Sequence, residues 1–134
     1  MVSRDTSLSL LTDTLNALAL RQRATIANIT NVDTPGYRAV KVSFEDQLRS
    51  ALGHLDSANG TPAHTAQNAT GGDPTVKALV TRQADQFTRV DGNSVQVDQE
   101  MSSLMETSMK YSAMARAVQN KLNILRSVIT SGQS

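Results

Sequence analysis

The chain has 134 residues, which gives room for one domain with a modest hydrophobic core. Its net charge is +1 and the basic residues are scattered, so the sequence lacks the basic patch that follows a nucleic-acid backbone. Cysteine is absent, which excludes disulfides, thiolate zinc sites and cysteine nucleophiles. No positively charged segment followed by an apolar run opens the chain, so we expect no cleavable secretory signal.

The first predicted element is an amphipathic helix from Asp5 to Val32. Apolar residues recur there at alternating steps of three and four, which places them on one face of a helix. Asp5, Thr6 and Ser7 are candidate N-caps, because their side-chain oxygens can accept hydrogen bonds from the first free amides. The residues of this face that we expect to make helix–helix contacts are Leu8, Leu11, Leu15, Leu18 and Ile29.

A turn is predicted directly after this helix. Thr34-Pro35-Gly36-Tyr37 fits a type II turn, in which proline presets the second position and glycine supplies positive φ at the third. Asn28 and Asn31 lie three residues apart on one face of the helix end. Their amides can bond to the free carbonyls of the helix end, to the turn or to a neighbouring subunit. We therefore interpret this stretch as the end of a helix and not as an active-site loop.

The middle of the chain carries weaker signals. Residues Ser43 to Asp46 resemble a capping box, and the apolar spacing after them predicts a short helix from about 44 to 52. Residues 53–74 are rich in turn formers and poor in large apolar side chains, so they are predicted to form a mobile loop. Residues 75–86 are ambiguous, whereas Asp91-Gly92-Asn93 between Phe87–Val90 and Val95–Val97 predicts a short β-hairpin.

The last predicted element is a helix from about Asp98 to Ser131, with Asp98 as its N-cap and Gly132 as its stop. Its apolar residues keep the same three-four stepping over more than four heptads, which is typical of a coiled-coil seam. The residues that we expect to make its helix–helix contacts are Met101, Leu104, Val118, Leu122, Leu125 and Ile129.

The two seams predict a mainly all-α fold in which the terminal helices form an antiparallel coiled-coil-like pair. Residues 1–32 and 98–134 would form an assembly domain, and residues 33–97 the turn, the short helix, the mobile loop and the hairpin. A two-helix pair covers only one side of each seam, so we interpret the chain as a subunit that its neighbours complete. The alternative is a soluble helical adaptor or export chaperone that binds partner helices.

Chemistry-bearing patterns are missing from the sequence. The two histidines, His54 and His64, are interpreted as solvated loop residues. No paired carboxylates, nucleophile-and-base arrangement or glycine-rich phosphate loop accompanies them. We therefore expect no catalytic residue, no cofactor, no metal and no small-molecule substrate.

Two stretches resemble the flagellar rod and hook family. "RQRATIANITNVDTPGYRAVKVSFEDQL", residues 21–48, is similar to the N-terminal signature of that family, although Thr30 stands where many members have alanine. "VDGNSVQVDQEMSSLMETSMKYSAMARAVQNKLNILRSVIT", residues 90–130, is similar to the C-terminal helix of its proximal-rod branch. The residues that match the family's turn motif are Asn28, Asn31, Thr34, Pro35, Gly36 and Tyr37.

This resemblance implies a function. It points to a structural subunit of the proximal rod in the flagellar basal body, whose terminal helices pack side by side in the wall of a periplasmic helical tube. Its partners would be other rod subunits, the membrane-ring and rod-junction proteins and the flagellar type III export apparatus. Phe44 and Leu48 resemble the segment that early export substrates present to the export gate, with an ordinary amphipathic turn as the alternative.

Overall fold

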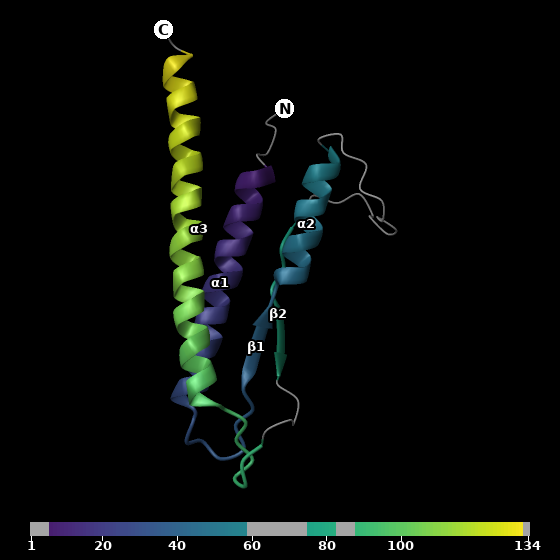
Figure 1. Ribbon diagram of the computed structural model, residues 1–134, viewed down its shortest axis with the longest axis vertical. Coiled ribbons are helices and arrows are strands. Elements are labelled where there is room, and N and C mark those ends of the chain that lie inside the picture. The colour runs from purple at the N-terminus through teal and green to yellow at the C-terminus, as the bar shows by residue number, and fades with distance from the viewer. Residues whose placement is uncertain (1–5, 59–74, 83–87, 133–134) are drawn as a thin grey trace.

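The computed structural model describes residues 6–58, 75–82 and 88–132 of the chain. Within this part the elements are α1 (Thr6–Thr30), β1 (Val40–Ser43), α2 (Glu45–Ala58), β2 (Leu79–Arg82) and α3 (Val97–Ser131). The central element is α1, which contacts α3, β1 and α2 (Figure 1). The predicted mainly helical fold, with two long terminal helices and one short antiparallel β element, is confirmed.

The two long helices run antiparallel, and two side-chain contacts set their register. Gln22 Nε2 lies 3.4 Å from Ser108 Oγ, and Asn28 Nδ2 lies 3.1 Å from Glu100 Oε2. Because both helices rise about 1.5 Å per residue, Thr6 at the start of α1 lies level with about residue 124 of α3. The last two turns of α3 therefore extend past α1, as the yellow end of the helix shows in Figure 1.

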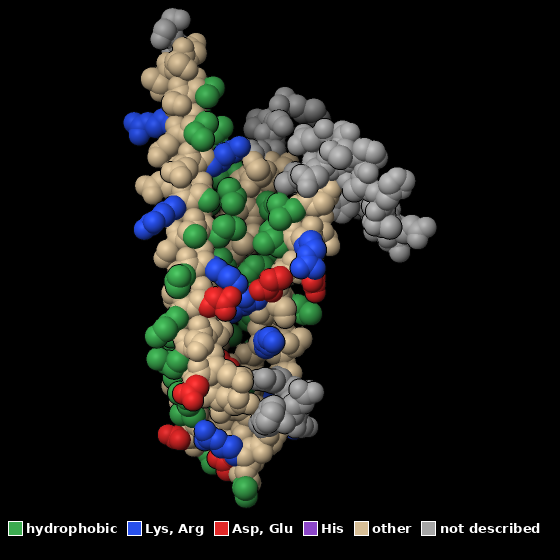
Figure 2. Space-filling model, in the orientation of Figure 1, with side chains coloured by type: hydrophobic (Ala, Val, Ile, Leu, Met, Phe, Trp, Pro, Cys, Tyr) green, Lys and Arg blue, Asp and Glu red, His purple; other side chains and the backbone are tan. Residues whose placement is uncertain are grey.

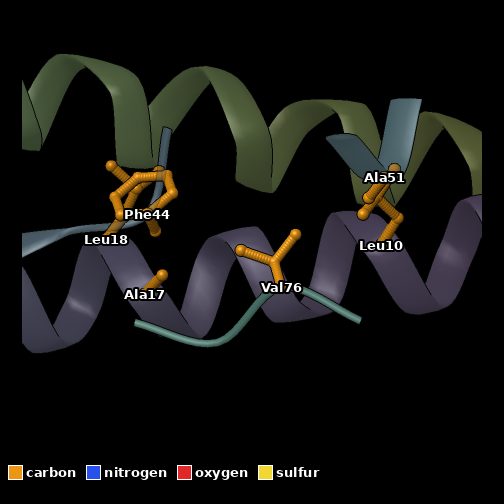
Figure 3. Packing of buried hydrophobic residues seen from close by; sticks show 6 residues of the cluster. All are labelled: Leu10, Ala17, Leu18, Phe44, Ala51 and Val76. Carbon is orange, nitrogen blue, oxygen red and sulfur yellow. The ribbon is translucent and has the colours of Figure 1, made fainter. Parts of the chain in front are cut away.

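The buried core is small and lies on the side of α1 that faces β1 and α2. Leu10, Ala17 and Leu18 of α1 meet Phe44, Ala51 and Val76 there (Figure 3). Thr14 and Thr25 of α1 are also buried. The Thr14 hydroxyl donates to the Leu10 carbonyl at 2.8 Å, so this polar group is buried without losing its hydrogen bond. Small and polar residues on this face let β1 and α2 approach α1 closely.

The β element lies at a different place from the predicted hairpin. Strands β1 and β2 pair antiparallel, with Val42 opposite Val80, although α2 lies between them in the sequence. The prediction of strands around Asp91-Gly92-Asn93 is wrong, because residues 88–96 form a turn and extended chain without a strand. The turn itself is present, and its backbone bonds to the turn after α1: Gly36 N–H donates to the Asp91 carbonyl at 2.9 Å.

Three predicted boundaries also differ. The short helix predicted at 44–52 runs from Glu45 to Ala58, so it includes residues assigned to the mobile loop, and residues 59–74 lie outside the described part. The N-cap of α3 is Gln96 and not Asp98, and Gln96 makes no side-chain capping bond. Gly132 follows the end of α3 as predicted, but with a right-handed φ of −77°.

Candidate assembly interface and helix-end junction

Asn28 joins three parts of the molecule at the last turn of α1. Its side chain is 1% exposed. Its Oδ1 accepts bonds from the Val40 amide at 2.9 Å and the Tyr37 hydroxyl at 3.2 Å. Its Nδ2 donates to the Val40 carbonyl at 2.9 Å and to Glu100 of α3. The N–H and the C=O of Val40 both bond to the Asn28 side chain. This side chain therefore takes the hydrogen-bonding positions that a neighbouring strand would fill along this edge of β1.

Asn31 and the turn behave as the sequence predicts. Asn31 Nδ2 donates to the Ala27 carbonyl at 2.8 Å, and its Oδ1 accepts from the Thr34 hydroxyl at 3.1 Å. Tyr37 N–H donates to the Thr34 carbonyl, and Gly36 has φ +72°, as a type II turn requires. Of the alternatives for the two asparagines, Asn31 satisfies the helix end and the turn. Asn28 reaches β1 and α3, which the sequence did not indicate.

Asn93, which the sequence analysis did not single out, closes the same end of α1. It is fully buried, and its Nδ2 lies 2.9 Å from the Asn31 carbonyl, 3.0 Å from that of Val32 and 2.8 Å from that of Thr34. Its Oδ1 accepts from the Val95 amide at 2.8 Å. The carbonyls of the turn that follows α1 are thus bonded by a residue about 60 positions away in the chain. We call Asn28, Asn31, Tyr37, Asn93 and Ser94 the helix-end junction.

The backbones of the two turns meet closely within the junction. Ser94 N–H donates to the Tyr37 carbonyl at 3.1 Å, and Ser94 Oγ accepts from the Ala39 amide at 2.9 Å. Gly92 has φ +81°, and a Cβ placed there would lie 3.3 Å from the Cα of Gly36. Both the backbone conformation and the limited space therefore favour glycine at position 92.

A second polar cluster fixes the start of α2 on α1. Arg21 pairs with Glu45 at 2.6 Å, donates from Nε to the Val42 carbonyl at 2.9 Å and lies 4.5 Å from the centre of the Phe44 ring. Phe44 is 5% exposed and Leu48 is half-buried, so the predicted export-gate segment lies in the folded core. An export apparatus could reach Phe44 only in an unfolded chain.

Glu45 makes the fold sensitive to acid. Burial raises the pKa of its carboxyl, but the bonds from the Phe44 amide and Arg21 outweigh this effect and hold the pKa below its ordinary value of 4.5. The ionised group therefore stabilises the fold above that value, and this contribution is lost as the pH falls through the lowered pKa. Glu45→Gln should lower the free energy of unfolding at neutral pH by at most about 1 kcal/mol, because the side chain is half-exposed.

Thermal unfolding of both proteins across the acid range measures this difference. We expect the gap between the wild-type and Glu45→Gln melting temperatures to close as the pH falls well below 4.5. An equal difference in melting temperature at neutral and at strongly acidic pH would contradict a stabilising role for the ionised Glu45 carboxylate.

A polar groove of about 510 Å³ lies between α1, β1 and the first half of α3. Three cationic and three anionic side chains line it, and four of these six pair with one another: Arg21 with Glu45, and Lys110 with Glu106 at 2.5 Å. A third acidic group, Glu100, bonds to Asn28. The Arg21–Glu45 pair holds α2 against α1 and the bond of Glu100 to Asn28 holds α3 against α1, whereas Lys110 and Glu106 pair within α3.

The residues predicted for helix–helix contacts differ in exposure. Leu18 is buried. The other predicted contact residues of α1 are half-buried, and so are three of those on α3: Leu104, Val118 and Leu125. Met101, Leu122 and Ile129 are 41%, 49% and 67% exposed. Leu10, which the spacing did not select, is buried in the core. Other large apolar side chains exposed on α3 are Met105, Met109, Ile124 and Val128.

These side chains give α3 a large apolar surface. Figure 2 shows hydrophobic side chains along the outer edge of its lower half and near its upper end. Clusters of exposed apolar side chains mark interaction sites in soluble proteins. In the described ranges, no helix has the length and hydrophobicity needed to cross a membrane. No group of three metal-binding side chains gathers among the same residues.

Known proteins with similar sequences cover nearly the whole chain. The flagellar basal body rod protein FlgB of Bacillus subtilis (strain 168) is 30% identical over 123 residues, which is 92% of each chain. FlgB of Escherichia coli (strain K12) is 30% identical over 133 residues, 96% of each chain. FlgB of Borreliella burgdorferi is 30% identical over 105 residues, 75% of this chain and 78% of the relative. No family model matches the chain. Because these relatives are 30% identical to the chain over most of its length, the chain belongs to the FlgB family of flagellar basal body rod proteins.

Proposed function

We propose that the chain is a structural subunit of the proximal rod. It self-assembles and co-assembles through α1 and α3 and helps to connect the membrane ring to the distal rod. The observation that carries this proposal is the apolar surface that α3 leaves uncovered. The names of the relatives, which are basal body rod proteins, support the location. Other rod subunits and the rod-junction proteins are the proposed partners.

The energetics favour a repeated assembly over a single contact. Fully burying a large aliphatic side chain contributes about 1.5–3 kcal/mol, so covering the exposed half of seven such side chains on α3 contributes on the order of 7 kcal/mol. Association costs roughly 4–15 kcal/mol in lost freedom of motion. One such contact is therefore marginal, whereas a subunit held by several neighbours at once is stable.

Cell fractionation tests the proposal against the adaptor alternative. In a strain that lacks the gene, a tagged copy of the chain should restore swimming and co-purify with isolated basal bodies. A cytoplasmic adaptor or chaperone would restore swimming but stay in the cytosolic fraction. Recovery only in the cytosol would therefore overturn the rod assignment.

We further propose that the chain reaches the periplasm through the flagellar type III apparatus, with Phe44 and Leu48 as the segment that contacts the export gate. Phe44→Ala should then lower the secreted amount. The same change also destabilises the core by about 3–5 kcal/mol, so reduced stability must be separated from reduced recognition.

Leu18→Ala is the matched control, because Leu18 packs beside Phe44 in the same core cluster (Figure 3). Leu18→Ala should lower the free energy of unfolding by about 2–5 kcal/mol, which is similar to the loss expected for Phe44→Ala. The measurement is the amount of each variant secreted, relative to the amount synthesised. We expect Phe44→Ala to be secreted less than Leu18→Ala, and equal secretion of the two variants would remove the gate assignment.

A further inference from the structure

The two edges of the small β-sheet differ in what covers them. β1 lies between α1 and β2 (Figure 1), and side chains of α1 occupy the edge of β1 that faces away from β2. Asn28 bonds to the N–H and the C=O of Val40, and Arg21 donates to the Val42 carbonyl. Because backbone groups alternate in direction along a strand, the bonds from β1 to β2 come from Lys41 and Ser43.

The same alternation fixes which backbone groups of β2 point outward. Thr81 and Leu79 stand opposite the two residues of β1 that bond to β2, so their backbone groups face β1. The N–H and C=O of Val80 and Arg82 therefore lie on the outer edge of β2. In the part of the chain that the structure describes, no hydrogen bond reaches these outward groups. An edge of this kind is a template for another strand.

Burial also ends at β2. Val42 and Val80 stand directly opposite each other, so their side chains lie on the same face of the sheet. Val42 is 3% exposed, whereas Val80 is 53% exposed. Along the chain that leads into β2, Val76 is buried, Ala78 is half-buried and Val80 is exposed. A strand added beside β2 would cover the Val80 side chain and extend the buried face.

Three cationic side chains lie on or next to β2. Lys77 precedes the strand, Arg82 ends it, and Lys41 stands opposite its third residue. All three are exposed, and none forms an ion pair among the described residues. A second copy of β2 on this edge would bring the same three cations from both copies together, and like charges across strands are destabilising. The charges therefore favour an occupant with acidic side chains.

We propose that the outer edge of β2 binds an extended, acidic segment of a different rod subunit, which joins the sheet as a third strand. The backbone groups of Val80 and Arg82 hold this segment, and the three cations select its carboxylates. The inference rests on the proposed function, because it makes the edge a contact between unlike subunits of the rod. The competing explanation is that the charges only protect the edge from pairing.

Val80→Pro tests whether the outward backbone groups are used. The N–H of Val80 does not bond to β1, so proline removes only an outward donor, at an edge position where strands tolerate it. Val80→Thr is the matched control, because threonine keeps the N–H and a β-branched side chain. In a strain that lacks the gene, Val80→Pro should be recovered with basal bodies several-fold less than Val80→Thr. Thermal unfolding of the isolated variants checks that both stay folded.

Arg82→Glu tests the charge and changes no backbone group, so it decides the question even if Val80→Pro unfolds. Its recovery with basal bodies should fall several-fold, whereas Arg82→Lys should be recovered like the wild type. Wild-type recovery of Arg82→Glu, or of a folded Val80→Pro, overturns the inference. The cations would then serve only to protect the edge.

Photo-cross-linking identifies the occupant. A photoreactive amino acid replaces Leu79, which is 57% exposed at the start of β2, and isolated basal bodies are irradiated. Mass spectrometry should find the cross-link on an acidic segment of another rod protein. A cross-link to β2 of a second copy, a cross-link to a segment without acidic residues, or no cross-link overturns the inference. A wild-type chain missing from basal bodies would instead contradict the proposed function itself.

Discussion

Asn93→Asp is expected to destabilise the fold by about 3–5 kcal/mol, a large fraction of the 5–15 kcal/mol that stabilises an ordinary domain. Asn93 is fully buried, and its Nδ2 faces the carbonyl oxygens of Asn31, Val32 and Thr34. The substitution removes these donors and places a carboxylate oxygen against the three oxygens. It also removes the side-chain bonds that hold the turn after α1 to the segment before α3.

Urea unfolding followed by circular dichroism measures this loss. Asn123→Asp is the control, because it makes the same chemical change on the exposed face of α3 and should shift the free energy of unfolding by no more than about 0.5 kcal/mol. The new carboxyl at position 93 should have a raised pKa, so its cost grows as the pH rises through that value and shrinks in mild acid. If Asn93→Asp is as stable as Asn123→Asp, Asn93 does not stabilise the turn after α1.

Leu122→Asp is expected to abolish swimming while the isolated chain stays folded. Leu122 is 49% exposed in the chain, so the substitution costs the subunit little by itself. In the assembled rod the same side chain is proposed to lie against a neighbour, where an unpaired charge costs several kcal/mol. Since each 1.4 kcal/mol is about a tenfold change in affinity, this loss weakens every contact of the repeating assembly by orders of magnitude.

Swimming in soft agar, secreted amount and basal-body fractionation together locate the defect. We expect no swimming and no basal-body fraction, with secretion at the wild-type level. Asn120→Asp adds the same charge two residues away on the exposed side of α3 and should leave swimming intact. Full motility of Leu122→Asp would exclude this part of α3 from the assembled interface.

Local patterns predicted the helices and the turn well, because their causes lie within a few residues. The three-four spacing placed α1 and α3 within two residues of their ends. Pro35 and Gly36 predicted the turn from their own backbone preferences. A local signal of the same kind gave a wrong prediction at Gly92. The turn sequence there indicated a hairpin, but the turn bonds to the turn after α1.

Features that depend on distant partners could not be predicted from the sequence. Strand β2 is four exposed residues, and the strand that pairs with it in the described ranges, β1, lies about 40 positions earlier. Thr14, Thr25 and Asn28 are among the most buried residues of α1, although polar residues usually indicate an exposed face. Asn93 has an ordinary turn signature, and nothing near it in the sequence identifies the carbonyls to which it donates.

The contacts of α1 with distant segments also bear on the order in which the chain folds. The ribosome releases α1 first, and Asn93, which bonds the carbonyls of the turn after α1, emerges about 60 residues later. The long helix α3, which pairs with α1, follows later still. Contacts between such distant segments form slowly, because the intervening loop must close first. The last quarter of the sequence, which forms α3, therefore supplies the final partner of α1.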